Sequence, residues 1–162
     1  MIMLSDCVRS DFVLKKIIDG IARRIFSEFG GDYKIYSEEV KQGFIQPCFI
    51  VKLVKSQCQK GIGGRNKYIN SFVIQYFPLE KDKNEKMNEV SDRLFDCLEF
   101  INAGKRVIRG TGMKSDKTSA ININGVNSTY ENGDGILEFY VNYNFHEIVV
   151  QNDEFMEDLR IV

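Results

Sequence analysis

Residues 137–146 are the segment whose pattern most constrains the fold of this chain. Apolar or aromatic side chains occupy every second position: Leu137, Phe139, Val141, Tyr143 and Phe145 alternate with Glu138, Tyr140, Asn142, Asn144 and His146. Because successive side chains of a strand point to opposite faces, the pattern predicts a β-strand with one face in a core. One such strand requires a sheet and a second layer to cover its apolar face.

Other segments supply the rest of that sheet, because they are rich in β-branched and aromatic residues. Glycines at 61, 63 and 64 mark a hairpin connection, so the strands on either side of them are predicted to be antiparallel neighbours. Pro47 fixes where the first of these strands begins, and Pro78 ends the second. The additional strands are predicted at residues 33–36, 48–57, 67–77 and 106–113.

Two helices are predicted from apolar residues at helical spacing. The first, capped by Ser10 or Asp11, runs to about Phe29, and Gly20 is a weak point within it that costs about 1 kcal/mol relative to alanine. Its inner stripe is Leu14, Ile17, Ile18, Ile21, Ile25 and Phe29. The second follows the charged stretch 80–86 and closes at Gly104, with the inner face Met87, Val90, Leu94, Cys97, Leu98 and Ile101.

The order of these elements predicts an α+β fold: an antiparallel β-sheet of strands of mixed length, with two amphipathic helices packed on one face. Residues 114–134, rich in Ser, Thr, Asn, Gly and Asp, predict an extended hairpin or loop arm that projects from it. A chain of 162 residues suits a single domain, assigned to 1–150, followed by a C-terminal tail at 151–162. The tail is a short amphipathic segment that we expect to dock onto a neighbour.

Composition argues against several classes of function. A net charge of −1 offers no field that would attract nucleic acid, and no apolar stretch reaches the ~20 residues that span a bilayer. No signal-peptide core follows the amino terminus, so we expect a soluble, intracellular protein. The scattered cysteines are interpreted as reduced thiols: Cys7, Cys48, Cys58 and Cys97.

No pattern of catalytic or metal-binding residues is apparent. His146, the only histidine, has no ligand partner at metal spacing and no serine or cysteine motif to serve, so a structural role is expected. The glycines of the 60–65 run lack the G-K-[ST] ending of a phosphate loop, and a strand follows them. Glu38 and Glu39 are adjacent and so would point to opposite faces of a strand. We therefore expect no enzyme, no cofactor and no metal.

Contact with other proteins is the better interpretation of the surface. Basic residues gather locally at Lys105, Arg106 and Arg109 and at Arg65 and Lys67, but within balanced acidic surroundings. Twelve Phe and seven Tyr exceed what so small a core ordinarily needs, which favours intersubunit contacts.

Four stretches of the sequence resemble phage tail terminator proteins. They are D-Y-K-I-Y-S-E-E-V-K-Q-G-F-I-Q-P-C-F-I-V-K-L at 32–53, Y-F-P at 76–78, R-G-T-G-M at 109–113 and L-E-F-Y-V-N-Y-N-F-H at 137–146. They occur in the family's order around two helices, whereas the long 114–134 segment and the acidic tail depart from the family pattern. The resemblance covers about two-thirds of the domain.

The resemblance implies a ring, usually of six subunits, on the end of a phage tail tube. Such a ring halts polymerisation of the tube or sheath and presents a surface for the neck or head-completion protein. The implied partners are other copies of the chain, the tail tube protein, the sheath protein where there is one, and the neck. The implied location is the neck end of a virion or bacteriocin tail that is assembled in the bacterial cytoplasm.

Ring or tube contacts are expected where exposed charge lies beside an apolar anchor. The interface residues predicted on this ground are Glu38, Glu39, Lys41, Phe44, Arg65, Lys67, Arg106 and Arg109. Two alternatives stay open from the sequence. One is a head-to-tail connector or tail-completion protein at another position, and the other is a small-molecule-binding α+β domain.

Overall fold

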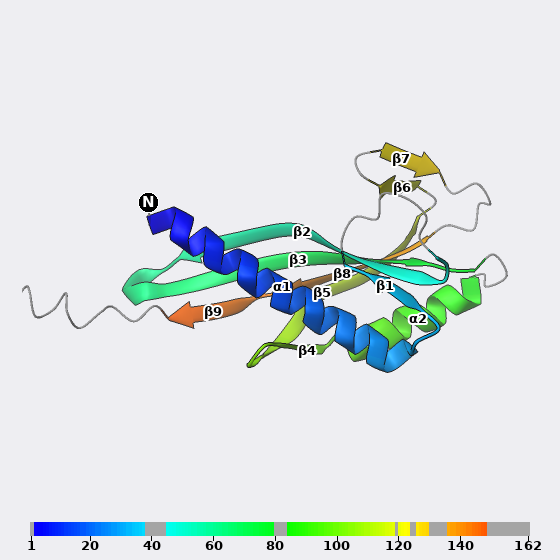
Figure 1. The fold of residues 1–162 in the computed structure, drawn as a ribbon, viewed down its shortest axis with the longest axis horizontal. Coiled ribbons are helices and arrows are strands. Elements are labelled where there is room, and N and C mark those ends of the chain that lie inside the picture. Colours follow the sequence, from blue (N-terminus) through cyan, green and yellow to red (C-terminus); the bar gives the residue numbers. More distant parts are fainter. Residues whose placement is uncertain are drawn as a thin grey trace, which may run out of the picture.

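The computed structural model describes residues 2–37, 45–79, 84–118, 120–123, 126–129 and 136–148. Two helices and a curled, mostly antiparallel sheet make an α+β fold, as the sequence predicts (Figure 1). The helices are α1 (Ile2–Phe29) and α2 (Asn84–Cys97), and a short 3₁₀ turn spans Ile62–Gly64. The strands are β1 (Lys34–Tyr36), β2 (Cys48–Lys60), β3 (Arg65–Phe77), β4 (Phe100–Ala103), β5 (Arg106–Thr118), β6 (Ala120–Ile123), β7 (Val126–Thr129), β8 (Ile136–Tyr143) and β9 (Phe145–Ile148).

The main sheet has the strand order β1-β2-β3-β8-β5-β4, and β9 pairs with β3 beyond the end of β8. The β2–β3 hairpin predicted from the three glycines is confirmed, with Cys48 opposite Phe77 and Lys60 opposite Asn66. One pair departs from the prediction, because β1 runs parallel to β2. The segment between them is longer than a tight hairpin turn, which allows the chain to return in the same direction. The sheet is therefore mixed.

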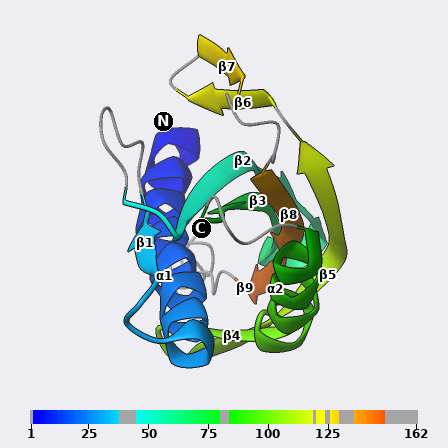
Figure 2. The same cartoon turned by 90° about the vertical axis from the view of Figure 1, so that its right-hand side faces the viewer.

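The core lies between the helices and the concave side of the sheet. Figure 2 shows α1 and α2 side by side within the curl that runs from β2 through β8 and β5 to β4. The apolar stripe of α1 is buried as predicted, except that Ile18 is only partly buried. The alternation in β8 is also confirmed, since Leu137, Phe139 and Val141 are all inaccessible or nearly so. The predicted strand 137–146 is divided, however, because β8 ends at Tyr143 and the chain continues from Phe145 as β9, which pairs with β3 and not with β5.

Both helix boundaries differ from the prediction. The first helix begins at Ile2, ahead of the expected caps. The second ends at Cys97 and not near Gly104, because Ile101 belongs to the short strand β4, which pairs with β5 and packs under α1. Leu98 and Ile101 are buried, but from the chain after the helix. Their spacing fitted a helix and a strand equally well.

The predicted arm starts later than residue 114, since β5 continues to Thr118 and pairs with β8 as far as Ile136. Beyond it, β6 and β7 form a separate two-stranded antiparallel sheet. Whether this hairpin serves as a projecting arm stays a prediction, and the tail at 151–162 lies outside the described residues. Neither described helix has an apolar stretch long enough to cross a membrane.

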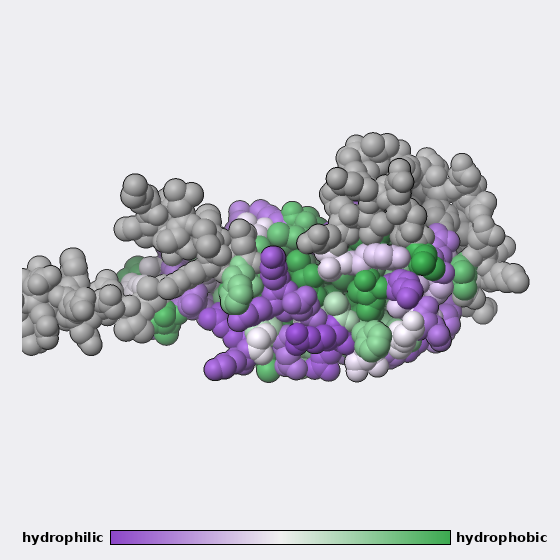
Figure 3. All heavy atoms as spheres, viewed as in Figure 1, coloured by the Kyte–Doolittle hydropathy of each residue, from purple (hydrophilic) through white to green (hydrophobic). Residues whose placement is uncertain are grey.

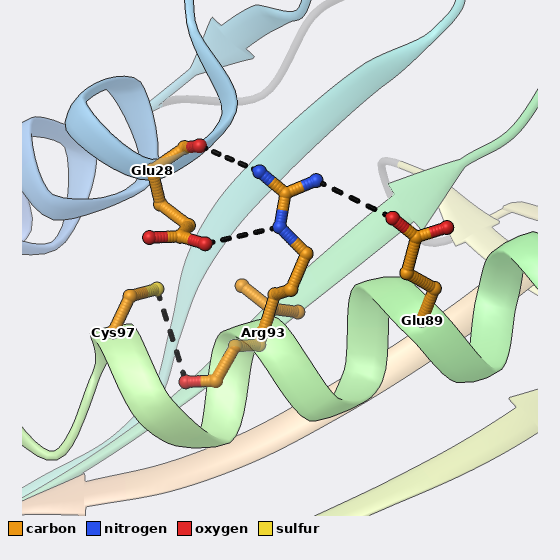
Figure 4. A network of polar contacts seen from close by, with 5 residues as sticks. Glu28, Glu89, Arg93 and Cys97 are labelled. Carbon is orange, nitrogen blue, oxygen red and sulfur yellow. Dashed lines mark hydrogen bonds and ion pairs between the residues drawn. The ribbon is translucent and has the colours of Figure 1, made fainter.

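Arg93 on α2 fastens the two helices together (Figure 4). Its Nε donates to Glu28 Oε1 at 3.0 Å and its Nη2 donates to the Glu28 carbonyl at 2.6 Å, while the guanidinium lies 4.3 Å from the Phe29 ring centre. Glu89 is a weaker second partner at 3.8 Å. One side chain thus satisfies a carbonyl in the last turn of α1 and sets the position of α2.

Candidate interaction surface

The sheet divides at one end, and the division forms a groove. Residues 110–118 of β5 pair with β8, but residues 106–109 pair instead with β4, while β9 stays with β3. The strands β5 and β9 therefore diverge around an open groove of about 770 Å³. Its lining includes Arg106, Val107, Arg109, Phe145, Glu147 and Ile148.

Aromatic and charged side chains pack against one another along the inner side of the groove. Phe145 stacks on Tyr68 with ring centres 4.7 Å apart, and the Arg106 guanidinium lies 4.7 Å from the Phe145 ring centre. Arg106 Nη2 also lies 3.6 Å from Glu147 Oε1. Burial, together with the nearby Cys58 and Glu147, raises the pKa of Tyr68 to about 12. Tyr68 therefore stays a neutral stacking partner at physiological pH.

The outer rim places exposed apolar groups beside cations. Val107 is 67% exposed and Ile148 is 66% exposed, so both apolar side chains face solvent where they line the groove beside the arginines. The Arg109 side chain is 68% exposed, 3.7 Å from Glu99 and stacked loosely over Phe100 at 5.9 Å. Apolar anchors next to arginines are the composition typical of protein–protein contacts.

The tip of the β2–β3 hairpin lies next to this groove. Lys67 is opposite His146 and Arg65 is opposite Ile148, so both basic residues extend the same strand pair that borders the groove. Ile62 at the tip is 96% exposed, above a smaller concavity of about 530 Å³. Elsewhere, the face of the molecule that carries α1 shows hydrophilic residues interspersed with apolar areas (Figure 3).

Four of the eight predicted interface residues are thus gathered at one end of the sheet: Arg65, Lys67, Arg106 and Arg109. The other four lie outside the described residues: Glu38, Glu39, Lys41 and Phe44. Three exposed apolar residues at the same end of the sheet were not among the predicted interface residues: Ile62, Val107 and Ile148. The only sequence signal for the exposure of Val107 and Ile148 is that each follows a charged residue. Ile62 lies between glycines, where an apolar residue has little to pack against.

Two kinds of chemical site can be examined in the described residues, a metal site and a nucleophilic cysteine. In the described part of the chain no three His, Cys, Asp or Glu side chains gather as a metal site would require. The described cysteines 48, 58 and 97 are free thiols, as predicted. Burial raises the pKa of both Cys48 and Cys97 to about 12, so neither forms the thiolate that a nucleophile needs.

The described surface of this α+β domain places exposed arginines beside exposed apolar side chains, a composition that suits contact with other proteins. A model of the family described as phage tail terminator protein matches residues 16–154, which is most of the chain. The chain belongs to the phage tail terminator family, a family of structural tail components, and the resemblance seen in the sequence is confirmed. Among curated proteins no match is found.

Proposed function

We propose that this protein forms a ring on the end of the phage tail tube, with six copies as the family resemblance implies. The ring stops further polymerisation of tube or sheath subunits and presents a surface for the neck or head-completion protein. The membership in the tail terminator family supports a role in ending the tail. The observation that supports this contact site is the groove at one end of the sheet, which is lined by Arg109 together with the exposed Val107 and Ile148.

A closed ring needs two different and complementary surfaces on each subunit. The groove end, which includes the hairpin residues Arg65 and Lys67, supplies one of them. The segment that carries Glu38, Glu39, Lys41 and Phe44 is the proposed second surface, because its two glutamates complement the hairpin residues Arg65 and Lys67 of the first. In this proposal the protein acts by assembly alone, without catalysis, at the neck end of a tail built in the bacterial cytoplasm.

Charge reversal at the groove tests this function. The double variant Arg106→Glu and Arg109→Glu removes two cations from the surface and leaves a carboxylate beside Glu147. The matched control is Lys15→Glu with Arg23→Glu, two exposed cations of α1. Both variants should keep the wild-type circular dichroism spectrum, since neither changes the core.

Tail length by electron microscopy is the measurement, with each variant as the sole source of the protein. The groove variant is expected to give overlong tails, and the α1 control tails of wild-type length. Tails of normal length in both cases would show that the groove end takes no part in termination.

A further inference from the structure

We propose that the groove between β5 and β9 receives residues 149–162 of a second copy as an added β-strand. The inference rests on the proposed self-assembly and names the partner of the same surface. Each subunit thus inserts its residues 149–162 into the groove of one neighbour and receives the same segment of another neighbour in its own groove.

The backbone of both groove walls suits an added strand. Among the described residues β9 pairs only with β3, and residues 106–109 of β5 pair only with β4. Alternate residues of a strand direct N–H and C=O groups to its two sides, so each wall turns part of its backbone toward the groove. An extended segment inserted there adds a strand to an exposed edge, a recurrent way for proteins to bind peptides.

The charge of the groove selects an acidic segment. Arg106 and Arg109 line the β4–β5 wall and outnumber Glu147, the one acid among the described residues of the groove lining, and Lys67 lies across from His146 on the other wall. Residues 149–162 carry four acids against a single arginine: Asp153, Glu154, Glu157 and Asp158, against Arg160. Opposite charge steers such a segment to the groove and sets its orientation there.

The apolar residues of the segment match the exposed anchors of the rim. Phe155, Met156 and Leu159 lie among the acids, so either face of an extended strand carries apolar groups beside carboxylates. Val107 and Ile148 are about two-thirds exposed in the single chain. Covering each of them removes apolar surface from water, which favours binding of the segment.

The occupant is the segment of another copy because a chain has difficulty returning to its own groove. The β9 strand ends at Ile148 and already forms one wall. A tight two-residue reversal requires glycine at one of its central positions in most cases, and residues 149–154 contain no glycine. Insertion into a neighbour also joins two different surfaces, which is the type of contact that closes a ring.

Cysteine cross-linking between two distinguishable full-length chains tests the inference. In a background with Cys7→Ser and Cys58→Ser, one tagged chain carries Val107→Cys and an untagged chain carries Met156→Cys. The mixed chains are expected to form a disulfide-linked pair of one tagged and one untagged copy under mild oxidation. A control chain with Asn88→Cys, on the exposed side of α2, should give no pair with the Met156→Cys chain.

A charge test accompanies it, because adding Glu154→Lys and Glu157→Lys to the Met156→Cys chain should lower the yield of the pair several-fold. No cross-link between chains would overturn the inference. A further chain carries both Val107→Cys and Met156→Cys. If its disulfide forms only within the chain and never between chains, the inference is also overturned, since the segment then folds onto its own groove.

Native mass spectrometry of the wild-type protein separates this inference from the proposed function. Closed rings without any cross-link overturn the strand insertion and leave the ring in place. Cross-linked pairs in a population that never forms closed rings support the insertion and count against the ring.

Discussion

Replacing Gly20 with alanine tests how α1 is seated on β4. Gly20 is buried within α1, where the helix crosses the backbone of β4. A Cβ built at this position would lie well inside van der Waals contact of the Asn102 carbonyl oxygen, 3.2 Å from the Asn102 carbonyl carbon and 3.6 Å from Ile101 Cβ. The helix therefore approaches the strand at a distance that only glycine permits.

Two opposing effects decide the size of the change. Helix propensity alone favours alanine over glycine by about 1 kcal/mol. Overpacking in a dense interior costs typically about 1–3 kcal/mol, and here the obstacle is a backbone carbonyl of a paired strand, which cannot rotate away. The overpacking cost therefore lies in the upper part of that range, and the gain in helix propensity offsets about 1 kcal/mol of it. Gly20→Ala is expected to lower the free energy of unfolding by about 1–2 kcal/mol.

Urea unfolding followed by far-ultraviolet circular dichroism measures this change. With a slope of roughly 2 kcal/mol per molar urea, the midpoint should fall by roughly 0.5–1 M. Ser27→Ala, an exposed site of α1, controls for helix propensity, and Gly31→Ala, where no atom lies within 4 Å of the added carbon, controls for the loss of a glycine. Both controls should leave the midpoint unchanged or slightly raised. A Gly20→Ala protein more stable than wild type would refute the close contact.

Three further predictions follow from single contacts. Tyr143→Phe should lower the free energy of unfolding by about 1–3 kcal/mol. It removes a buried hydroxyl that donates to the Leu98 carbonyl at 2.7 Å and leaves that carbonyl unsatisfied, so an unchanged urea midpoint would contradict the prediction. Arg93→Lys should cost about 0.5–1.5 kcal/mol, since a lysine cannot reach both the carboxylate and the carbonyl of Glu28 with a planar fork, and equal stability would show that the fork is dispensable. Cys48, whose pKa is raised to about 12 by burial, should take up no iodoacetamide at about pH 8 in the native protein and react fully in urea, whereas native labelling seen by mass spectrometry would show that the site opens.

The elements with a single clear periodicity could be predicted from the sequence. Strand β8 alternates without interruption, and the β2–β3 hairpin is marked by its glycines, so both were located to within a few residues. The stripe from Leu14 to Phe29 likewise placed the buried face of α1. Local pattern and tertiary packing agree in these segments.

Other elements depended on contacts that are distant in sequence. Ile101 fitted the helical stripe, but pairing with β5 takes it into β4. Gly20 was interpreted as a weak point of a helix, because nothing in the sequence shows that the backbone of Asn102 lies against it. The parallel pairing of β1 with β2 was likewise invisible to local pattern.

The groove could not be predicted either. It begins where the β5–β8 pairing ends at Gly110 and Tyr143, so that residues 106–109 of β5 keep only β4 and β9 keeps only β3. The β5–β8 register shift between Thr111 and Lys114, where Gly112 has a positive φ of 60°, lies next to this point. The run R-G-T-G-M contains the glycines that permit this bulge, but not its position relative to β9. The arginines at 106 and 109 were identified from their charge, while the surface that they share with Ile148 required the fold.

Electron microscopy of tails made with and without this protein tests the central claim, that it ends the tail and prepares it for joining, most directly. Tails assembled without it should be overlong and lack heads, and wild-type protein supplied in trans should restore both their length and a terminal ring. Tails of normal length that carry heads in its absence would contradict the claim.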